Sequence, residues 1–210
     1  MSFDYNFHVK RERPEDRFRD VREYYRNETL LSYANSKNMR RIQEKITRRV
    51  LELFELKDQD KLILDAGCGP GFASFYLEQE GYKLVSLDLI TQFLTIYNMS
   101  EINPIAGDMS FLPFKPNTFD GIISISALQW IYRDFNKELD KRRMIELAKS
   151  FYSVLKKNGI IIIQFYPKSI TILEEIGNIF VKYVPLEGGY IIDNQNNPKK
   201  RRIFLKLSKP

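Results

Sequence analysis

The stretch with the clearest chemical potential is Asp65–Gly71, "DAGCGPG", in which three glycines occupy alternate positions. Glycine lets the backbone turn tightly and approach a ligand, because no Cβ stands in the way. The loop directly follows "KLIL", an apolar run typical of a strand buried on both faces. A plain tight turn between a strand and a helix uses the same glycines, so the loop by itself does not specify a ligand.

Asp88 favours a ligand over a plain turn. It ends the next apolar run, "KLVSLDL", where a carboxylate can accept hydrogen bonds from the two hydroxyls of a ribose. NAD and S-adenosylmethionine both carry such a ribose. The spacing G-x-G-x-G differs from the G-x-G-x-x-G that binds a pyrophosphate. Asp65 would repel a pyrophosphate but suits an amino group and a sulfonium, so we favour S-adenosylmethionine.

The segment "GDM", residues 107–109, supports the same choice. Asp108 can accept a hydrogen bond from the exocyclic amine of adenine, and Met109 can pack on the ring. The sequence therefore predicts three ligand-binding segments, each placed just after an apolar run.

The three ligand-binding segments would be positioned by strands and helices that alternate along the chain. Strands are expected at Leu62–Ala66, Lys83–Leu89, Ile102–Ala106, Phe119–Ile125 and Ile160–Phe165, with a closing pair at Tyr190–Ile192 and Arg202–Leu207. Helices are expected at Leu30–Leu56, Phe72–Gln79, Thr91–Asn98, Lys137–Lys156 and Ile170–Tyr183, and Asn158-Gly159 is interpreted as the stop signal of the fourth. The residues before about Asn27 are expected to be irregular, and Pro104 places the third strand at a sheet edge. Such alternation predicts an α/β fold with a mostly parallel sheet covered on both faces.

Composition limits the classes of protein that the chain can belong to. With 210 residues and 43% apolar content we expect one core, with residues 1–56 as a helical extension of the same domain as residues 57–210. One cysteine, Cys68, and one histidine, His8, argue against a disulfide, a metal site or a histidine-based triad. No apolar run is long enough to cross a bilayer and no signal peptide opens the chain, so we expect a cytoplasmic protein without a membrane partner.

The net charge of +6 suggests a nucleic-acid partner, although a general excess of surface lysines would give the same value. Two basic clusters favour RNA, with a solvated surface as the alternative reading. They comprise Lys37, Arg40, Arg41, Lys45 and Arg48 on the expected first helix, and Lys199, Lys200, Arg201 and Arg202 near the C-terminus.

If S-adenosylmethionine serves here as a methyl donor, the residues of the chain limit which groups could accept the methyl. Cys68 lies in the glycine loop, where it cannot act as the nucleophile that methylation of a pyrimidine ring carbon needs. After the fourth expected strand stands "SISALQW" instead of the Asn/Asp-Pro-Pro-aromatic segment that handles adenine amines. Guanine N7 has a free lone pair, so its methylation needs no catalytic base to remove a proton. Candidate acceptor-side residues are Ser126, Gln129, Trp130 and Tyr166, although simple core packing would also account for Trp130.

The segments "LDAGCGPG", "LVSLDL", "AGDMSFLPF" and "FDGIISISALQW" together resemble the Rossmann-like class I methyltransferases. The resemblance implies a seven-stranded sheet whose last hairpin is reversed, and a bound S-adenosylmethionine. The implied cofactor residues are Tyr33, Asp65, Gly67, Cys68, Gly69, Gly71, Asp88, Leu89, Asp108 and Met109.

Further segments, "ISISALQW", "SFYSVLKKNG", "QFYP" and "GGYIIDNQNNPKKRRIFLKL", resemble the small-subunit (18S) rRNA guanine-N7 methyltransferases of eukaryotes. The resemblance runs from about Tyr24 to Leu207, and the absence of a long basic tail after Pro210 fits an archaeal-type member. It implies methylation of small-subunit rRNA during ribosome biogenesis. Two alternatives stay open, namely methylation of a small molecule or protein, and a ribosome-assembly role that does not depend on methyl transfer.

The same family resemblance implies a partner. Its members form heterodimers with a small zinc-binding activator protein that extends the sheet beside the third strand. In this chain the edge would be Ile102–Ala106, with Leu94, Ile96, Tyr97 and Ile105 as apolar residues that the contact would cover. The alternative is that these residues pack under the sheet.

Overall fold

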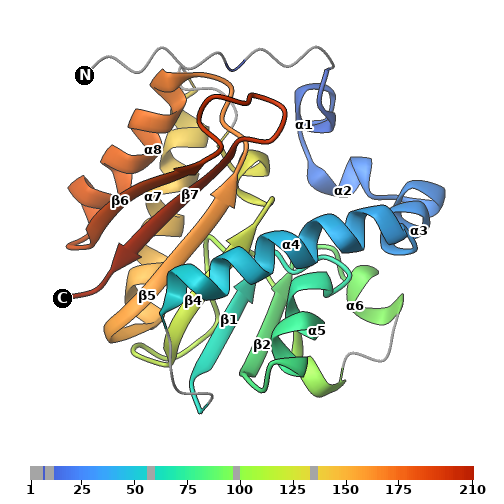
Figure 1. The fold of residues 1–210 in the computed structure, drawn as a ribbon, viewed down its shortest axis with the longest axis horizontal. Coiled ribbons are helices and arrows are strands. Elements are labelled where there is room, and N and C mark those ends of the chain that lie inside the picture. Colours follow the sequence, from blue (N-terminus) through green and yellow to red (C-terminus); the bar gives the residue numbers. More distant parts are fainter. Residues whose placement is uncertain (1–6, 8–11, 56–59, 97–99, 133–136) are drawn as a thin grey trace.

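The fold is built on one sheet of seven strands, in the order β3-β2-β1-β4-β5-β7-β6. The structure is a computed structural model that describes residues 7, 12–55, 60–96, 100–132 and 137–210 (Figure 1). The strands are β1 (Leu62–Ala66), β2 (Lys83–Asp88), β3 (Pro104–Ala106), β4 (Phe119–Ile125), β5 (Leu155–Phe165), β6 (Glu187–Asp193) and β7 (Arg202–Ser208). The first five pair in parallel, whereas β7 runs antiparallel to both β5 and β6. The predicted seven-stranded sheet with a reversed last hairpin is confirmed.

Helices cover both faces of this sheet (Figure 1). They are α1 (Pro14–Arg17), α2 (Val21–Tyr24), α3 (Asn27–Ala34), α4 (Lys37–Phe54), α5 (Phe72–Gln79), α6 (Phe93–Ile96), α7 (Glu138–Val154) and α8 (Ile170–Tyr183), with short 3-10 turns η1 (Ser100–Ile102) and η2 (Leu128–Trp130). One apolar cluster joins α4 and α5 to the sheet, and a larger one joins α7 and α8 to it. No helix in the described ranges combines the length and apolar character that a membrane crossing requires.

Helix α4 attaches the N-terminal residues to the sheet. Its inner face buries Ile46, Val50 and Phe54 completely. The Phe54 ring lies on Gly121 of β4, where a Cβ would come within 2.4 Å of the ring. Glycine is thus the residue that permits the helix to approach the sheet this closely.

The predicted N-terminal helix is wrong in its extent. The expectation of one helix over Leu30–Leu56 is replaced by α3 and α4, with a break at Asn35-Ser36. Ser36 starts the second helix, because its side chain accepts a hydrogen bond from the backbone N–H of Met39 over 3.2 Å. Leu56 lies outside the described residues, and the stretch expected to be irregular contains the single turns α1 and α2.

Other boundaries also differ from the prediction. Asn158-Gly159 does not end the fourth helix: α7 stops at Val154 and the chain enters β5 directly, with the pair forming an irregularity inside the strand, where Asn158 has a φ of 62°. Ile102 belongs to η1 rather than to β3 and is fully buried. The helix expected over Thr91–Asn98 corresponds to the shorter α6, and the last two residues of the expected range lie outside the described residues. The first strand of the closing hairpin is longer than expected.

Candidate active site

The loops that follow the carboxyl ends of the parallel strands surround one cavity of about 420 Å³. Ligands of open α/β sheets bind at this end, and the volume falls within the roughly 300–1,000 Å³ of small-molecule sites. The predicted residues that line the cavity are Tyr33, Asp65, Gly67, Cys68, Gly69, Asp88, Leu89, Asp108, Met109, Ser126 and Trp130. Segments separated by as much as 97 positions in the sequence are thus brought to one place.

The glycine loop is closely packed against the segment after β4. Gly67, Gly69 and Gly71 all have positive φ, between 55° and 86°. A Cβ on Gly67 would lie 2.6 Å from the Cβ of Ala127, so no larger residue fits there. Gly71 does not line the cavity. It is the N-cap of α5, where its positive φ lets the loop turn into the helix.

Asp88 is a buried carboxylate at the cavity wall. Its two oxygens accept hydrogen bonds from the backbone N–H groups of Gly69 and Ile90, each over 2.7 Å. Burial nevertheless raises the pKa of Asp88 to about 6, against the lowering effect of these bonds. Each oxygen keeps a further lone pair, which is what recognition of two ribose hydroxyls requires.

Asp65 lies deeper, at the end of β1. Its carboxylate accepts a hydrogen bond from the hydroxyl of Ser74 over 2.6 Å, and Ser86 in turn donates to Ser74 over 2.8 Å. Complete burial raises the pKa of Asp65 to about 7, with a smaller contribution from the charge of Asp88. Such a carboxylate favours a cationic ligand group, which would restore its ionised form.

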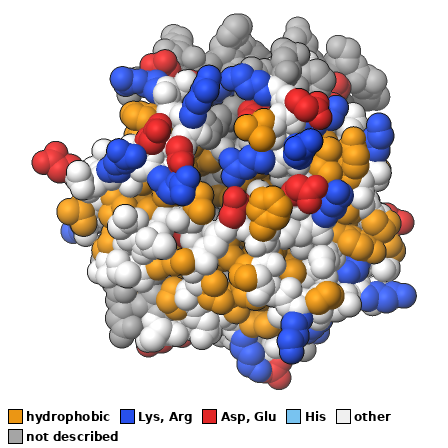
Figure 2. All heavy atoms as spheres, turned by 180° about the vertical axis from the view of Figure 1, so that it is seen from behind, with side chains coloured by type: hydrophobic (Ala, Val, Ile, Leu, Met, Phe, Trp, Pro, Cys, Tyr) orange, Lys and Arg blue, Asp and Glu red, His pale blue; other side chains and the backbone are white. Residues whose placement is uncertain are grey.

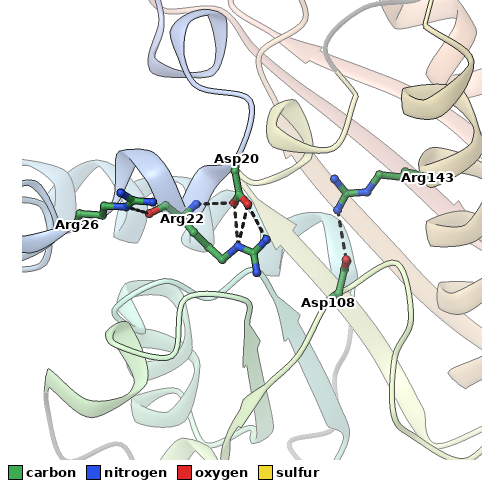
Figure 3. A network of polar contacts seen from close by, with 5 residues as sticks. All are labelled: Asp20, Arg22, Arg26, Asp108 and Arg143. Atoms are coloured by element: carbon green, nitrogen blue, oxygen red, sulfur yellow. Dashed lines mark hydrogen bonds and ion pairs between the residues drawn. The ribbon is translucent and has the colours of Figure 1, made fainter.

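Asp108 carries a contact that the sequence did not suggest (Figure 3). Its Oδ2 pairs with the guanidinium of Arg143 on α7 over 3.2 Å, and its Oδ1 accepts a hydrogen bond from the Ser110 backbone over 2.9 Å. Arg22 of α2, held by Asp20 over 2.6 Å, lines the same cavity as this pair. Charged groups thus meet at this side of the cavity from the N-terminal segment, α7 and the loop after β3.

Ser126 is half-buried and belongs to a chain of hydrogen-bonded polar groups. It has a φ of 57°, and its hydroxyl donates to Gln164 Oε1 over 2.9 Å while accepting from Gln43 Nε2 over 3.4 Å. Gln43 also hydrogen-bonds Tyr33 and lines the cavity. The sequence analysis missed Gln43 as a site residue. The available signal was a polar residue on the stripe of α4 that carries Ile46 and Val50.

Two predicted acceptor residues, Gln129 and Tyr166, do not line the main cavity. They lie around a small neighbouring void of about 10 Å³ together with Lys168. The N-terminal residues 12–25, which we call the strap, lie against this region: Arg13 donates to the backbone carbonyl of Tyr166, and Asp16 forms an ion pair with Lys168. The strap therefore contacts the loop after β5 that carries Tyr166 and Lys168.

Aromatic rings gather beside the cavity. Tyr25 of the strap contacts Tyr33, Phe93 and Trp130 with ring centroids 5.2, 5.0 and 6.1 Å apart. Tyr33 also lies 5.9 Å from Phe72. Except for Tyr33 and Trp130, these rings were not predicted as site residues, because nothing in the sequence pattern links the strap to α6.

The basic residues predicted to bind RNA are at the surface. Lys37, Arg40, Arg41, Lys45 and Arg48 are exposed on α4, and Lys199 and Lys200 are exposed at the tip of the β6–β7 hairpin, while Arg201 and Arg202 are half-buried beside them. Arg49 links the two clusters, because it forms two hydrogen bonds with Asp193 at the base of that hairpin, over 2.9 and 3.1 Å. On the opposite face of the molecule, charged side chains of both signs are interspersed (Figure 2).

Comparison with known proteins places this chain in a family. A family model described as a methyltransferase domain matches residues 64–163. The 18S rRNA (guanine-N7)-methyltransferase of Bos taurus is 34% identical over 189 residues, which cover 88% of this chain and 67% of the relative. The chain belongs to the 18S rRNA (guanine-N7)-methyltransferase family. The family also includes the 18S rRNA (guanine(1575)-N7)-methyltransferase of Saccharomyces cerevisiae. This relative is 32% identical over 81% of this chain and 63% of its own length. The chain spans about two thirds of the length of these family members.

Solved structures agree on the fold. A protein of Pyrococcus horikoshii superposes with a TM-score of 0.65 at 17% identity, covering 90% of this chain and 99% of its own. A Haemonchus contortus phosphoethanolamine N-methyltransferase in complex with S-adenosyl-L-methionine superposes with a TM-score of 0.59 at 17% identity. The match covers 79% of this chain and 52% of the Haemonchus chain. The family domain therefore has the methyltransferase fold that the sequence predicts.

Proposed function

We propose that this protein transfers a methyl group from S-adenosylmethionine to N7 of a guanine in small-subunit rRNA, as part of ribosome biogenesis. The observation that carries the proposal is the identity of 34% to an 18S rRNA (guanine-N7)-methyltransferase over 88% of the chain. The cavity supports it, because the residues expected for this cofactor meet there.

The residues around the cavity fit S-adenosylmethionine. In this proposal Asp88 accepts hydrogen bonds from the ribose hydroxyls and Asp65 faces the ammonium of the methionine part. Asp108 and Met109 hold the adenine. Leu89 and Cys68 complete the apolar wall, and burial raises the pKa of the Cys68 thiol well above its ordinary value, so this side chain stays protonated. The cofactor supplies a methyl group on a sulfonium, which a ring nitrogen can take with its lone pair without losing a proton.

The acceptor side supports a ring nitrogen as the target. The Ser126 hydroxyl already donates a hydrogen bond to Gln164, so we expect this side chain to shape the acceptor pocket rather than to act as a base. Gln129 donates to the backbone carbonyl of Ser126 over 2.8 Å, and its buried Oε1 has no hydrogen-bond partner among the described residues. This oxygen can accept from the N–H groups of a guanine edge once Tyr166 and the strap make room.

The methylated atom can be tested directly. Purified protein is incubated with labelled S-adenosylmethionine and an rRNA fragment, and with the same fragment in which 7-deazaguanosine replaces guanosine. We expect label in the first RNA, released as N7-methylguanine, and none in the second. Equal labelling of both would refute N7 as the target, and label only in protein or small molecules would refute the RNA substrate.

We also propose a partner at the sheet edge. Strand β3 pairs only with β2 in the described part of the chain, and Leu94, Ile96 and Ile105 beside it are half-buried. Tyr97 lies outside the described residues. A small zinc-binding activator protein would add a strand here and form a heterodimer, which we expect to act in the cytoplasm.

The partner proposal makes a simple prediction. The protein expressed alone should be poorly soluble or bind the cofactor weakly, and co-expression with the partner should correct both. Ile105→Asp should prevent co-purification of the two proteins, whereas Leu139→Asp, an exposed position on α7, should not. A soluble and fully active monomer in light scattering would exclude an obligatory activator.

A further inference from the structure

We propose that Tyr24 and Trp130 form the two walls of a slot that binds the acceptor guanine and stabilises the charge it acquires. This inference rests on the proposed function and names a substrate-binding residue, Tyr24, that lies in the strap. Tyr24 is far from Trp130 in the sequence, and only the fold brings the two rings together.

Trp130 is well placed to be the inner wall. It ends η2, directly after β4, and lines the cavity together with Ser126 and Ala127. A planar base stacked on its indole would therefore lie next to the cofactor site. It is also the single tryptophan of the chain.

Of the two strap rings that contact that indole, Tyr24 is the more nearly parallel to it. The two ring centroids are 5.7 Å apart with an angle of 30° between the planes, whereas Tyr25 meets Trp130 at 54°. Phe18 and Tyr25 also contact Tyr24, with ring centroids 5.5 and 4.8 Å away. Atoms in contact are about 3.5 Å apart, so a base between the rings needs a centroid separation of about 7 Å. The centroid separation of 5.7 Å must therefore increase by at least about 1 Å.

The polar contacts that tie α1 to the body oppose this movement only weakly. Helix α2 is a single turn, and isolated turns have little stability of their own. The contacts of α1 with the body include the ion pair between Asp16 and Lys168, and the hydrogen bond from Arg13 to the Tyr166 carbonyl. Partly exposed ion pairs of this kind contribute little, typically less than about 1 kcal/mol.

The slot also has a chemical advantage for this reaction. As the bond between N7 and the methyl carbon forms, the bond from that carbon to sulfur breaks and its electron pair stays on sulfur. The positive charge then passes from the sulfonium to the guanine ring, and no proton moves. Aromatic faces attract cations, so two rings that enclose the guanine stabilise the charged product, and the transition state leading to it, more than the neutral base.

The experiment uses the fluorescence of Trp130 as a direct readout. Guanosine 5′-monophosphate and 7-methylguanosine 5′-monophosphate are titrated into the full chain saturated with S-adenosylhomocysteine. We expect both to quench the fluorescence, with the methylated nucleotide bound about 10-fold more tightly. Equal affinity of the two nucleotides, or no quenching by either, would overturn the slot.

Variants separate stacking from closure of the strap. Tyr24→Leu should abolish the preference for the methylated nucleotide and lower kcat/KM for RNA by about 10- to 100-fold, while Tyr24→Phe should keep both within about threefold. Asp16→Ala loosens the strap but leaves the ring, so the preference should persist. If Asp16→Ala lost it as fully as Tyr24→Leu, closure and not stacking would be responsible. Thermal unfolding of each variant verifies that it is folded.

The same assay distinguishes this inference from the proposed function. Methylation of rRNA at N7 without any nucleotide preference would overturn the slot and leave the function intact. Absence of N7 methylation by the wild-type protein together with its partner would overturn the function itself.

Discussion

At the scale of single residues, the site depends on carboxylates in unlike surroundings. Asp65 and Asp88 are buried and lose hydration, whereas Asp108 is partly exposed and paired with Arg143. The first two lie at the ends of neighbouring parallel strands, so their charges also interact. Two predictions follow from this difference in surroundings.

Asp88→Asn should weaken S-adenosylhomocysteine binding by about 10- to 100-fold, because one oxygen that accepts a backbone N–H becomes a donor facing it. The free energy of unfolding should fall by about 1–3 kcal/mol for the same reason. Isothermal calorimetry and denaturant unfolding measure the two effects. Asp60→Asn is the control, since this exposed carboxylate pairs with Lys83 at the other end of β2. Unchanged affinity in Asp88→Asn would remove Asp88 from the cofactor site.

The pH dependence of cofactor binding tests Asp65. Burial raises the pKa of Asp65 to about 7 and that of Asp88 to about 6, both above the ordinary value of 3.8. Between about pH 4 and about pH 7 the folded protein therefore holds more protons than the unfolded chain, and the unliganded protein loses stability as the pH rises. A ligand ammonium favours ionised Asp65, so the affinity for S-adenosylhomocysteine should increase from about pH 6 to about pH 8.

Two variants assign this pH dependence. Asp65→Asn should remove most of the rise in affinity. Ser74→Ala deletes the hydrogen bond that lowers the pKa of Asp65, so the rise should move to higher pH. Calorimetric titrations across the pH range measure both. A profile that is the same in all three proteins would assign the rise to other groups.

At the scale of elements, the approach of α4 to β4 positions both Gln43 and the basic face of the helix. Gly121→Ala places a methyl group 2.4 Å from the Phe54 ring, and overpacking of this kind costs about 1–3 kcal/mol. Denaturant unfolding measures the loss, and Phe54→Leu in the same chain should recover part of it. Gly189→Ala is the control, because a Cβ there meets nothing within 4 Å. Equal effects at the two glycines would contradict tight packing of α4 on the sheet.

At the scale of the whole molecule, the two basic clusters are joined through Arg49 and Asp193 into one surface that is predicted to contact phosphates. Removing four exposed charges of α4 should flatten the salt dependence of RNA binding, because each lost phosphate contact reduces the slope by roughly 0.7–0.9. The variant replaces by alanine Lys37, Arg41, Lys45 and Arg48.

The magnitude of the slope of log K against log salt concentration should decrease by roughly 3 to 4 units for this variant if all four side chains contact phosphates. A control variant removes the same number of positive charges elsewhere, at Lys115, Lys149, Lys157 and Lys182, all of which are exposed. Equal slopes for the two variants would show that overall charge, and not the surface on α4, attracts the RNA.

The sequence alone was sufficient for the layers of the fold and for the cofactor loops. Apolar runs and glycine spacing reflect local backbone requirements. Gly67, Asp88 and Asp108 lie at or just beyond the ends of strands, and these ends must meet in a parallel sheet. Where local signals compete, they are misleading. Asn158-Gly159 is typical of the end of a helix, yet the pair lies within β5, where its backbone forms hydrogen bonds with Lys209 just beyond β7. Strand pairing depends on residues that are distant in the sequence, so the conformational preference of a short segment cannot reveal it.

Only the tertiary structure decided what surrounds the acceptor. The strap contributes Tyr24, Tyr25 and Arg22, and no periodicity in those residues indicates that they lie beside Trp130 or close to Asp108. Gln43 becomes a site residue only because α4 buries it against Ser126. These contacts join segments more than 80 positions apart, and they form because the packed sheet, rather than the local sequence, fixes where each segment lies.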